Sequence, residues 1–368
     1  MFEWNKKEAP LLGLTGLGGG IGSGLQGGGT PMSATGGNYV LEPGNGYKYH
    51  TFTANGAFVC TDLGDTGEIE VLVVGGGGGG ANGGGEGGGG GGAGGLRNFT
   101  ITLTAAGPAT YPVTVGEGGA AIAYNTWPHA PGEGSESSFN APGGNSITKV
   151  VASGGGCAGS YDNESTPGAQ IDGSPGGSGG GGGAYSHGGQ QGLTVASPDG
   201  RSPTVQGYPG GGGSTPYSNR GSGGGGASAV GNWGGGPDGP GPTARSKGGE
   251  GTPLPAFPYP ACFGAPIVPT FATPTNPLPG YVTSPTSDHY AGGGGGGANT
   301  SPGWGAIIPG GTGGGGGGGS RNSPTPGTNQ VAFQGTHYLG GGGGGTAVGG
   351  APDTGPGGDG VVIVRYAV

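Results

Sequence analysis

The chain has 368 residues, of which 111 are glycine and 33 are proline, and its formal net charge is −9. Only 30% of the residues are hydrophobic and 8% are charged, so a core made of side chains alone would be thin for this length. With 11 lysines and arginines in total, the chain lacks the basic surface that a nucleic-acid partner requires.

The cysteines and histidines do not predict a metal centre. Cys60, Cys157 and Cys262 are odd in number and lack C-x-x-C spacing, so neither a disulfide framework nor a zinc site is indicated. The five histidines are scattered without metal-ligand spacing. We therefore expect no metal and no cofactor. No continuous apolar stretch reaches the roughly eighteen residues of a membrane span, so we expect none.

The N-terminal residues 1–37 are predicted to form an attachment peptide followed by a glycine linker. Residues 10–25 are uncharged, and their apolar residues recur at roughly helical spacing. We interpret them as a docking peptide that becomes ordered on a partner protein, because glycine-rich helices are weak alone. A secretory signal peptide and an unstructured tail are the alternatives. The candidate attachment residues are Leu11, Leu12, Leu14, Leu17, Ile21 and Leu25.

Residues 38–153 contain a series of strand-like segments. Asn55 and Gly56 lie between two of them and predict a hairpin. The turn at 106–108 favours a second local pairing, between the segments on either side of it. Short strands in this number are typical of a small antiparallel β-sandwich. The predicted strands are 47–53, 57–61, 69–74, 99–103, 111–115 and 147–152.

The segment 361–366 is again β-branched and apolar, and we predict that it returns to the same sheet. Residues 38–153 and 361–368 would then form one β-rich base. In this base, residues 75–95 are a small glycine-rich insertion and residues 154–360 are a large one.

The glycine runs, such as 75–80, 87–92 and 340–345, decide what the large insertion can be. Glycine is nearly a third of this chain, against about 7% in average proteins. Because glycine loses more backbone entropy on folding than any other residue, such runs are disordered unless dense hydrogen bonding holds them. Disorder normally accompanies a scarcity of aromatic residues, whereas this chain has 14 tyrosines, 9 phenylalanines and 4 tryptophans.

An extended helix with three residues per turn offers an ordered alternative. Its backbone N–H and C=O groups are unpaired within the helix, so neighbouring glycine helices can satisfy one another. The glycines come in blocks instead of at every third position, which excludes a collagen helix. We therefore predict a mainly β and non-regular fold, in which a bundle of packed polyglycine II helices with long loops is inserted into the sandwich.

The segments between glycine runs are the candidate recognition elements, and the longest, residues 253–290, is dense in proline and aromatics. Loops held by a rigid scaffold are where binding residues concentrate, and aromatic rings supply contact area at low entropy cost. An equally weighted alternative is that the rings cap the glycine bundle. The candidates are Tyr185, His187, Tyr217, Trp233, Tyr259, Phe263, Tyr281, His289, Tyr290 and Trp304.

Sequence patterns typical of enzyme sites occur in this chain only because it is rich in glycine. Dinucleotide-type patterns need a strand, a turn and a helix, and no helical pattern follows residues 69–80. The nucleophile-elbow pattern at 176–180 lacks both its strand and its helix. The carboxylate pairs Glu68/Glu70 and Glu133/Glu136 fit the solvent face of a strand and a loop. We expect a protein that is not an enzyme.

The strand–glycine junctions carry a resemblance to a known family. Ile69-Glu70-Val71-Leu72-Val73-Val74 runs straight into six glycines, and Gly360-Val361-Val362-Ile363-Val364-Arg365-Tyr366 closes the chain. This pairing resembles a glycine-rich domain of phage tail proteins and some bacterial proteins. The alternation of glycine runs with aromatic segments is also similar to the tip adhesins of T-even-like phage long tail fibres.

The resemblance implies a virion protein that binds a bacterial surface protein or glycan through loops between polyglycine helices. Its partners would be other virion proteins, contacted through the N-terminal segment, the host receptor, and further copies of itself in a homo-oligomer. A purely structural virion protein, such as a fibre, whisker or capsid decoration, is the first alternative. An ice-binding glycine-helix protein is the second, and an enzyme such as a polysaccharide depolymerase is the third.

Overall fold

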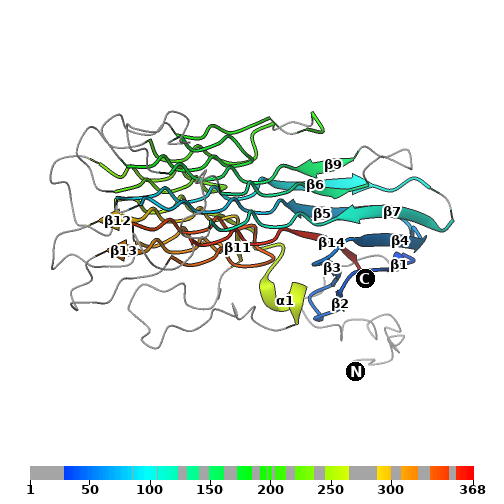
Figure 1. The fold of residues 1–368 in the computed structure, drawn as a ribbon. Helices are drawn as coiled ribbons and strands as arrows, with labels where there is room; N and C mark the ends of the chain where they lie inside the picture. Colours follow the sequence, from blue (N-terminus) through cyan, green and yellow to red (C-terminus); the bar gives the residue numbers. More distant parts are fainter. Residues whose placement is uncertain are drawn as a thin grey trace, which may run out of the picture.

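The computed structural model describes residues 29–84, 86–105, 107–122, 131–140, 149–160, 172–184, 191–196, 198–200, 204–212, 220–235, 245–264, 288–299, 308–321, 332–347 and 354–368. The molecule has two parts, which lie end to end in Figure 1. One end is built from β-strands and contains the C-terminus. The other is a slab of extended, wavy backbone segments that lie side by side.

The β-rich end consists of two five-stranded sheets in which every strand pair is antiparallel. The first sheet has the order β2-β3-β14-β5-β6, and the second has the order β1-β4-β7-β8-β9. The first sheet contains β2 (Tyr39–Leu41), β3 (Tyr47–Phe52), β14 (Val361–Ala367), β5 (Glu68–Val74) and β6 (Leu96–Thr102). The second contains β1 (Ser33–Thr35), β4 (Gly56–Asp62), β7 (Ala109–Thr114), β8 (Ser137–Phe139) and β9 (Val150–Ala152).

The two sheets bury a common side-chain core. Phe52 and Val71 of the first sheet belong to the same buried cluster as Phe58, Tyr111 and Phe139 of the second. Alternate residues of β5 and β14 contribute, as expected where two sheets pack face to face. The predicted antiparallel β-sandwich is therefore confirmed.

The predicted local pairings are wrong, because each predicted turn crosses between the sheets. β3 lies in the first sheet and β4 in the second, so the turn at Asn55 and Gly56 does not close a hairpin. The turn between β6 and β7 crosses in the same way. Crossing buries both Phe52 and Phe58 in the interior, which a flat hairpin would not do. β1 also joins the second sheet, so the sandwich begins before residue 38.

The predicted return of the chain end is confirmed. β14 pairs antiparallel with β5, with Val361 opposite Val74 and Arg365 opposite Glu70. β14 also pairs with β3, so it lies at the centre of its sheet. The strand that leads into the first glycine run and the strand that follows the last one are therefore neighbours.

The glycine segments bond to one another with a period of three residues. In the run 75–81, residues 75, 78 and 81 donate backbone hydrogen bonds to the run 87–95. Residues 76 and 79 donate to the segment 132–135, and residues 77 and 80 donate to the segment 355–358. These seven N···O distances lie between 2.8 and 3.0 Å. Each run is thus surrounded by several others, and its buried backbone groups are satisfied between segments instead of within one.

The spacing of these segments excludes side chains. A Cβ added at Gly78 would stand 2.1 Å from the carbonyl oxygen of Gly156, and one at Gly91 would stand 2.1 Å from that of Gly78. Non-bonded carbon atoms need about 3.5 Å from their neighbours. Glycine is therefore required here because of close backbone approach.

Short elements complete the fold. They are α1 (Tyr259–Phe263) and the two-residue strands β10 (Thr252–Pro253), β11 (His289–Tyr290), β12 (Ala298–Asn299) and β13 (Ser320–Arg321). β10 pairs with β11, and β12 pairs with β13. α1 packs against β2 and β3, at the boundary between slab and sandwich (Figure 1).

Candidate functional site

Three of the predicted recognition residues are buried where the slab meets the sandwich. Tyr259, Phe263 and Tyr290 belong to a cluster with Tyr49 and Leu72 of the first sheet. The rings of Tyr259 and Tyr290 meet edge to face, with centroids 5.1 Å apart. With no exposed ring surface, Tyr259 and Tyr290 offer a partner nothing to stack on, and their burial favours the capping role.

The polar atoms of this cluster are satisfied internally. The Tyr290 hydroxyl donates to the carbonyl of Phe257 at 2.8 Å, and the Tyr259 hydroxyl donates to the carbonyl of His289. Burial raises the pKa of both tyrosines well above the ordinary value, and it raises the pKa of the nearby Cys262 thiol to about 12. These groups therefore stay protonated and unreactive at neutral pH.

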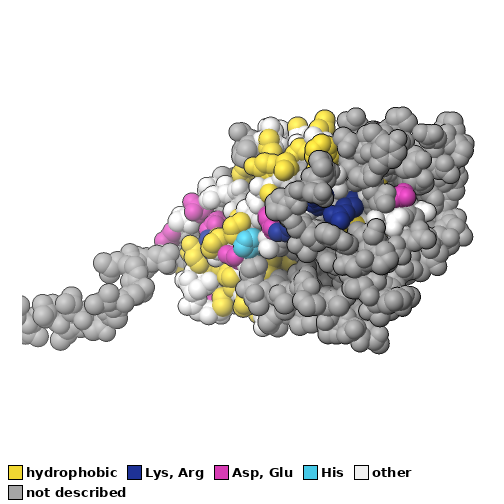
Figure 2. All heavy atoms as spheres, turned by 90° about the vertical axis from the view of Figure 1, so that its left-hand side faces the viewer, with side chains coloured by type: hydrophobic (Ala, Val, Ile, Leu, Met, Phe, Trp, Pro, Cys, Tyr) yellow, Lys and Arg dark blue, Asp and Glu magenta, His cyan; other side chains and the backbone are white. Residues whose placement is uncertain are grey.

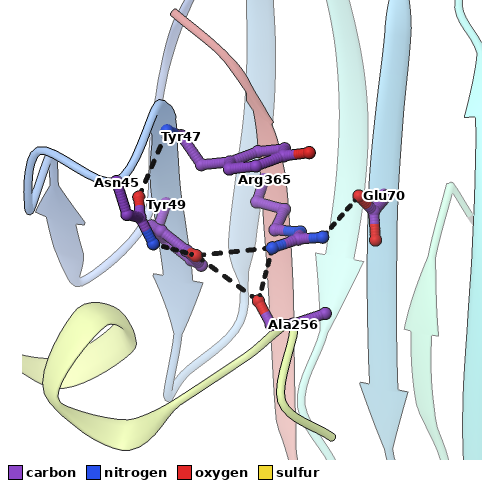
Figure 3. Close-up of polar contacts among 6 residues, drawn as sticks. All are labelled: Asn45, Tyr47, Tyr49, Glu70, Ala256 and Arg365. Carbon is purple, nitrogen blue, oxygen red and sulfur yellow. Dashed lines mark hydrogen bonds and ion pairs between the residues drawn. The ribbon is translucent and has the colours of Figure 1, made fainter. Parts of the chain in front are cut away.

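Arg365 fastens the segment before α1 to the first sheet (Figure 3). Its guanidinium donates to the carbonyl of Ala256 at 2.7 Å and to the carboxylate of Glu70 at 2.6 Å. It also lies over the ring of Tyr47, 4.1 Å from the centroid. Burial alone would lower the pKa of Arg365, but the hydrogen bonds that it donates to Glu70 and Tyr49 raise it. The sequence does not signal this role, because Arg365 reads as one polar residue in an apolar strand.

Two further predicted residues, His289 and Trp233, lie in the described part of the chain, and the others lie outside it. His289 is half-buried, and its Nδ1 lies 3.6 Å from Asp288 Oδ1, which is too far for a hydrogen bond. Trp233 has 52% of its surface exposed. Five recognition candidates and all six attachment candidates lie outside the described residues: Tyr185, His187, Tyr217, Tyr281, Trp304, Leu11, Leu12, Leu14, Leu17, Ile21 and Leu25.

Trp233 belongs to a group of exposed apolar side chains on adjacent segments of the slab, which we call the apolar face. Its members are Leu193, Val205, Tyr208, Val230 and Trp233. They lie on the segments 191–196, 204–212 and 220–235. These segments are adjacent, because Gly210 donates its N–H to the carbonyl of Gly192, and Gly231 donates its N–H to the carbonyl of Pro209. Figure 2 shows hydrophobic side chains gathered along the upper edge of the slab.

The apolar face is only partly readable in the sequence. Trp233 and Tyr208 are aromatic residues between glycine runs, although only Trp233 was predicted. Leu193, Val205 and Val230 are isolated aliphatic residues in polar surroundings, and nothing in the sequence brings them together. Their proximity depends on the order of segments in the slab. Apolar residues that gather on a surface in this way mark interaction sites more often than scattered ones do.

The described part of the chain meets neither the requirements of a metal site nor those of a membrane-spanning helix. No group of three or more histidines, cysteines, aspartates or glutamates is arranged there to hold a metal ion. Within the same ranges, no helix has the length and apolar character needed to cross a membrane.

Comparison with known proteins identifies the family. A search of curated proteins finds no significant match. A family model described as a glycine-rich domain matches residues 52–253. The match covers more than half of the chain, from the end of β3 through the first glycine runs to β10. It includes the junction between β5 and residues 75–80, where the period of three begins. The chain therefore belongs to the glycine-rich domain family.

Proposed function

We propose that the protein is a phage virion component, a tail-fibre protein or receptor-binding adhesin, that binds a bacterial surface protein or glycan. It acts from the outside of the particle, without catalysis. The observation that carries the proposal is the apolar face, displayed on a slab that side chains do not hold together. A scaffold of this kind leaves its outward side chains available for recognition.

The glycine segments serve as this scaffold in the form of polyglycine II helices. The hydrogen-bond period of three supports this, because such helices have three residues per turn. So does the burial of the runs 75–81 and 87–95, where a backbone without partners would be costly. Gly78 and Gly91 support it further, since only glycine allows helices to approach so closely.

The N-terminal segment attaches the protein to other virion proteins, and the slab end points away from the particle. Figure 1 supports this polarity, because the first described residues belong to the sandwich. Several copies on one particle, or a homo-oligomer, would raise the overall binding strength through avidity.

A purely structural virion role is the second candidate, and one observation favours it. Tyr259, Phe263 and Tyr290, which were predicted to contact a receptor, are instead buried. If the apolar face were likewise covered by a neighbouring virion protein, the chain would be a fibre or decoration protein.

Cell binding by the purified, fluorescently labelled full chain tests the proposal across a panel of bacterial strains. An adhesin should bind a subset of strains, and Trp233→Ala combined with Tyr208→Ala should reduce that binding by about tenfold or more, as aromatic anchors do. Val40→Ala is the control and should leave binding unchanged, because Val40 is exposed on the sandwich, away from the apolar face.

The outcomes separate the two candidates. Strain-selective binding that depends on the apolar face supports an adhesin. Uniform absence of binding, together with assembly of the chain onto particles that still adsorb without it, supports the structural role and overturns the adhesin.

A further inference from the structure

The chain passes from β1 in the second sheet to β2 in the first through residues 36–38, which we call the crossing. Gly36 and Gly37 have φ angles of +105° and +99°, a backbone conformation that L side chains rarely adopt. A Cβ added at Gly36 would also stand 2.0 Å from the carbonyl oxygen of Ala57 in β4. The crossing therefore follows a path that only glycine allows, close against the second sheet.

Two buried side chains of the first sheet hold the crossing and β1. His50 of β3 donates from Nδ1 to the carbonyl of Gly36 at 2.7 Å. Tyr366 of β14 is hydrogen-bonded through its hydroxyl to the backbone of Ala34 in β1. The two rings also stack on each other with centroids 5.6 Å apart, and His50 Nε2 lies 3.3 Å from the Tyr366 hydroxyl. The first sheet therefore holds the N-terminal strand through a connected pair of polar side chains.

This arrangement requires a neutral imidazole in one tautomer. A carbonyl oxygen only accepts hydrogen bonds, so the proton of neutral His50 is on Nδ1. Nε2 is then the acceptor for the Tyr366 hydroxyl. A second proton on the ring would occupy Nε2 and take this acceptor away from the hydroxyl. Protonation of His50 therefore removes a hydrogen bond from a buried group, which destabilises the contact.

The surroundings of His50 do not compensate a positive charge. The side chain is fully buried, and the ring of Phe58 from the second sheet meets it edge to face with centroids 5.3 Å apart. Among the described residues no carboxylate forms an ion pair with His50. A charge buried without an opposite partner is costly.

The titratable groups around His50 do not supply a negative charge either. Lys48, two residues earlier on β3, repels a proton on the ring. Tyr366 stays protonated because burial raises its pKa, and Cys60 of β4 and Glu42, which follows β2, act on this tyrosine. Burial, and to a smaller extent Lys48, lower the pKa of His50 below 6.5, although its hydrogen bond to a backbone carbonyl opposes them.

We propose that His50 is an acid-sensitive latch: protonation of its imidazole releases the crossing and β1 from the sandwich, while the two sheets stay folded. β1 is suited to local release, because it is a three-residue edge strand that pairs only with β4 and buries only Ala34. The latch goes beyond the proposed adhesive function and does not depend on it. Where residues 1–37 attach the chain to a particle, acid would loosen the fold next to the attachment.

The direction of the pH effect follows from the linkage between protonation and local folding. Well above pH 6.5, His50 is neutral in both the latched and the released state, so pH does not change their balance. Between pH 6.5 and the lowered pKa of latched His50, only the released state binds the proton. The released state then gains up to about tenfold in population for each pH unit of acidification. Below the lowered pKa the effect is complete.

Two measurements on the full chain test the latch. In an NMR titration with labelled histidines, His50, assigned by its contacts with Phe58 and Tyr366, should titrate below pH 6.5; a midpoint at 6.5 or above overturns the proposal. In hydrogen–deuterium exchange corrected for the intrinsic rate at each pH, protection of amides 33–38 should fall by about tenfold from pH 7.5 to pH 5.0. The amides of β5 should keep their protection. Unchanged protection of 33–38, or an equal loss in β5, overturns the proposal.

Substitutions identify the group that senses pH. His50→Gln keeps a side-chain N–H donor but does not titrate, so the protection of amides 33–38 should be the same at the two pH values. His337→Gln is the matched control, because His337 lies beside Asp359 in the slab, and this variant should keep the tenfold loss. If His50→Gln still shows that loss, another group is the sensor and the proposal is wrong. If His50→Gln does not fold, the NMR midpoint of the unsubstituted protein decides.

Discussion

The guanidinium of Arg365 lies 2.6 Å from the carboxylate of Glu70 and links the two strands that enter and leave the glycine slab. Glu70 is on β5, which runs directly into residues 75–81, and Arg365 is on β14, which follows Gly360. The same guanidinium holds the carbonyl of Ala256, far away in the sequence. One side chain therefore joins the base of the slab to the segment that leads into α1.

Arg365→Gln should destabilise this junction. The variant loses charged hydrogen bonds to Glu70 and Ala256 and the contact with the Tyr47 ring, and only 12% of the Arg365 side chain is exposed. We expect a loss of about 2–3 kcal/mol in the free energy of unfolding. Chemical denaturation measures it, and limited proteolysis should cut within 254–264 first.

Glu70→Gln is the matched variant, because it removes the charge and keeps an acceptor oxygen. Its cost should be smaller, about 1 kcal/mol, since the Glu70 side chain is 26% exposed. The double variant should cost less than the sum of the two single variants. Strict additivity would contradict the pairing.

Gly91→Ala tests whether close backbone packing holds the slab. The new methyl group would stand 2.1 Å from the Gly78 carbonyl oxygen, and neither atom can move away without moving the backbone. Overpacking of this kind should cost about 3 kcal/mol or more. Thermal unfolding measures the change against Gly212→Ala.

Gly212 is a suitable control because the nearest atom to its added Cβ is Nε1 of Trp233, at an ordinary 3.6 Å. Gly212→Ala should change stability by less than about 1 kcal/mol, since it also reduces the entropy of the unfolded chain. Similar effects of the two substitutions would speak against tight packing around Gly91.

His337 and Asp359 form a pH-dependent contact between segments of the slab. His337 Nδ1 lies 2.8 Å from Asp359 Oδ2, and Gly118 donates its N–H to the other carboxylate oxygen. The hydrogen bond that His337 donates to Asp359 raises the pKa of His337 above its ordinary 6.5 and lowers the pKa of Asp359 below its ordinary 3.8. The raised histidine stabilises the fold fully below pH 6.5, and the lowered carboxylate does so above pH 3.8.

The stabilising effect of this pair should therefore be greatest between these limits and decline as the pH rises through the pKa of folded His337. His337→Gln should lower stability more at pH 5.5 than at pH 8.5, by less than about 1 kcal/mol because the pair is partly exposed. Denaturation of both proteins at the two pH values measures it. An equal difference at the two pH values would exclude a charged His337 in the folded protein.

The sequence predicts the positions of most long strands, but it does not predict how most of them pair with one another. Apolar, β-branched segments identified β3 to β7, β9 and β14, and the return of β14 to β5 follows from the glycine insertion between them. The turn at Asn55 and Gly56 reports a chain reversal, but it does not report whether the next strand stays in the same sheet. That choice depends on burying Phe52 and Phe58 together, which is a tertiary effect.

The sequence identified aromatic residues as candidates for the site, but it did not tell which of their side chains would be exposed. Trp233 was predicted and is exposed, whereas Tyr259 and Tyr290, with the same aromatic character, are buried against the first sheet. Tyr208 and Trp233 are distant in the sequence, and their segments become neighbours only because of the order of segments in the slab. No local pattern in the sequence encodes that order.

Hydrogen–deuterium exchange of the glycine runs tests the central claim most directly, because nearly every backbone N–H in residues 75–81, 87–95 and 340–346 donates to another segment. The account predicts that these amides exchange as slowly as those of β5 and β14, at least a thousandfold more slowly than an unstructured chain, on the order of 4 kcal/mol of protection. Exchange at the rate of an unstructured chain would contradict an ordered glycine scaffold.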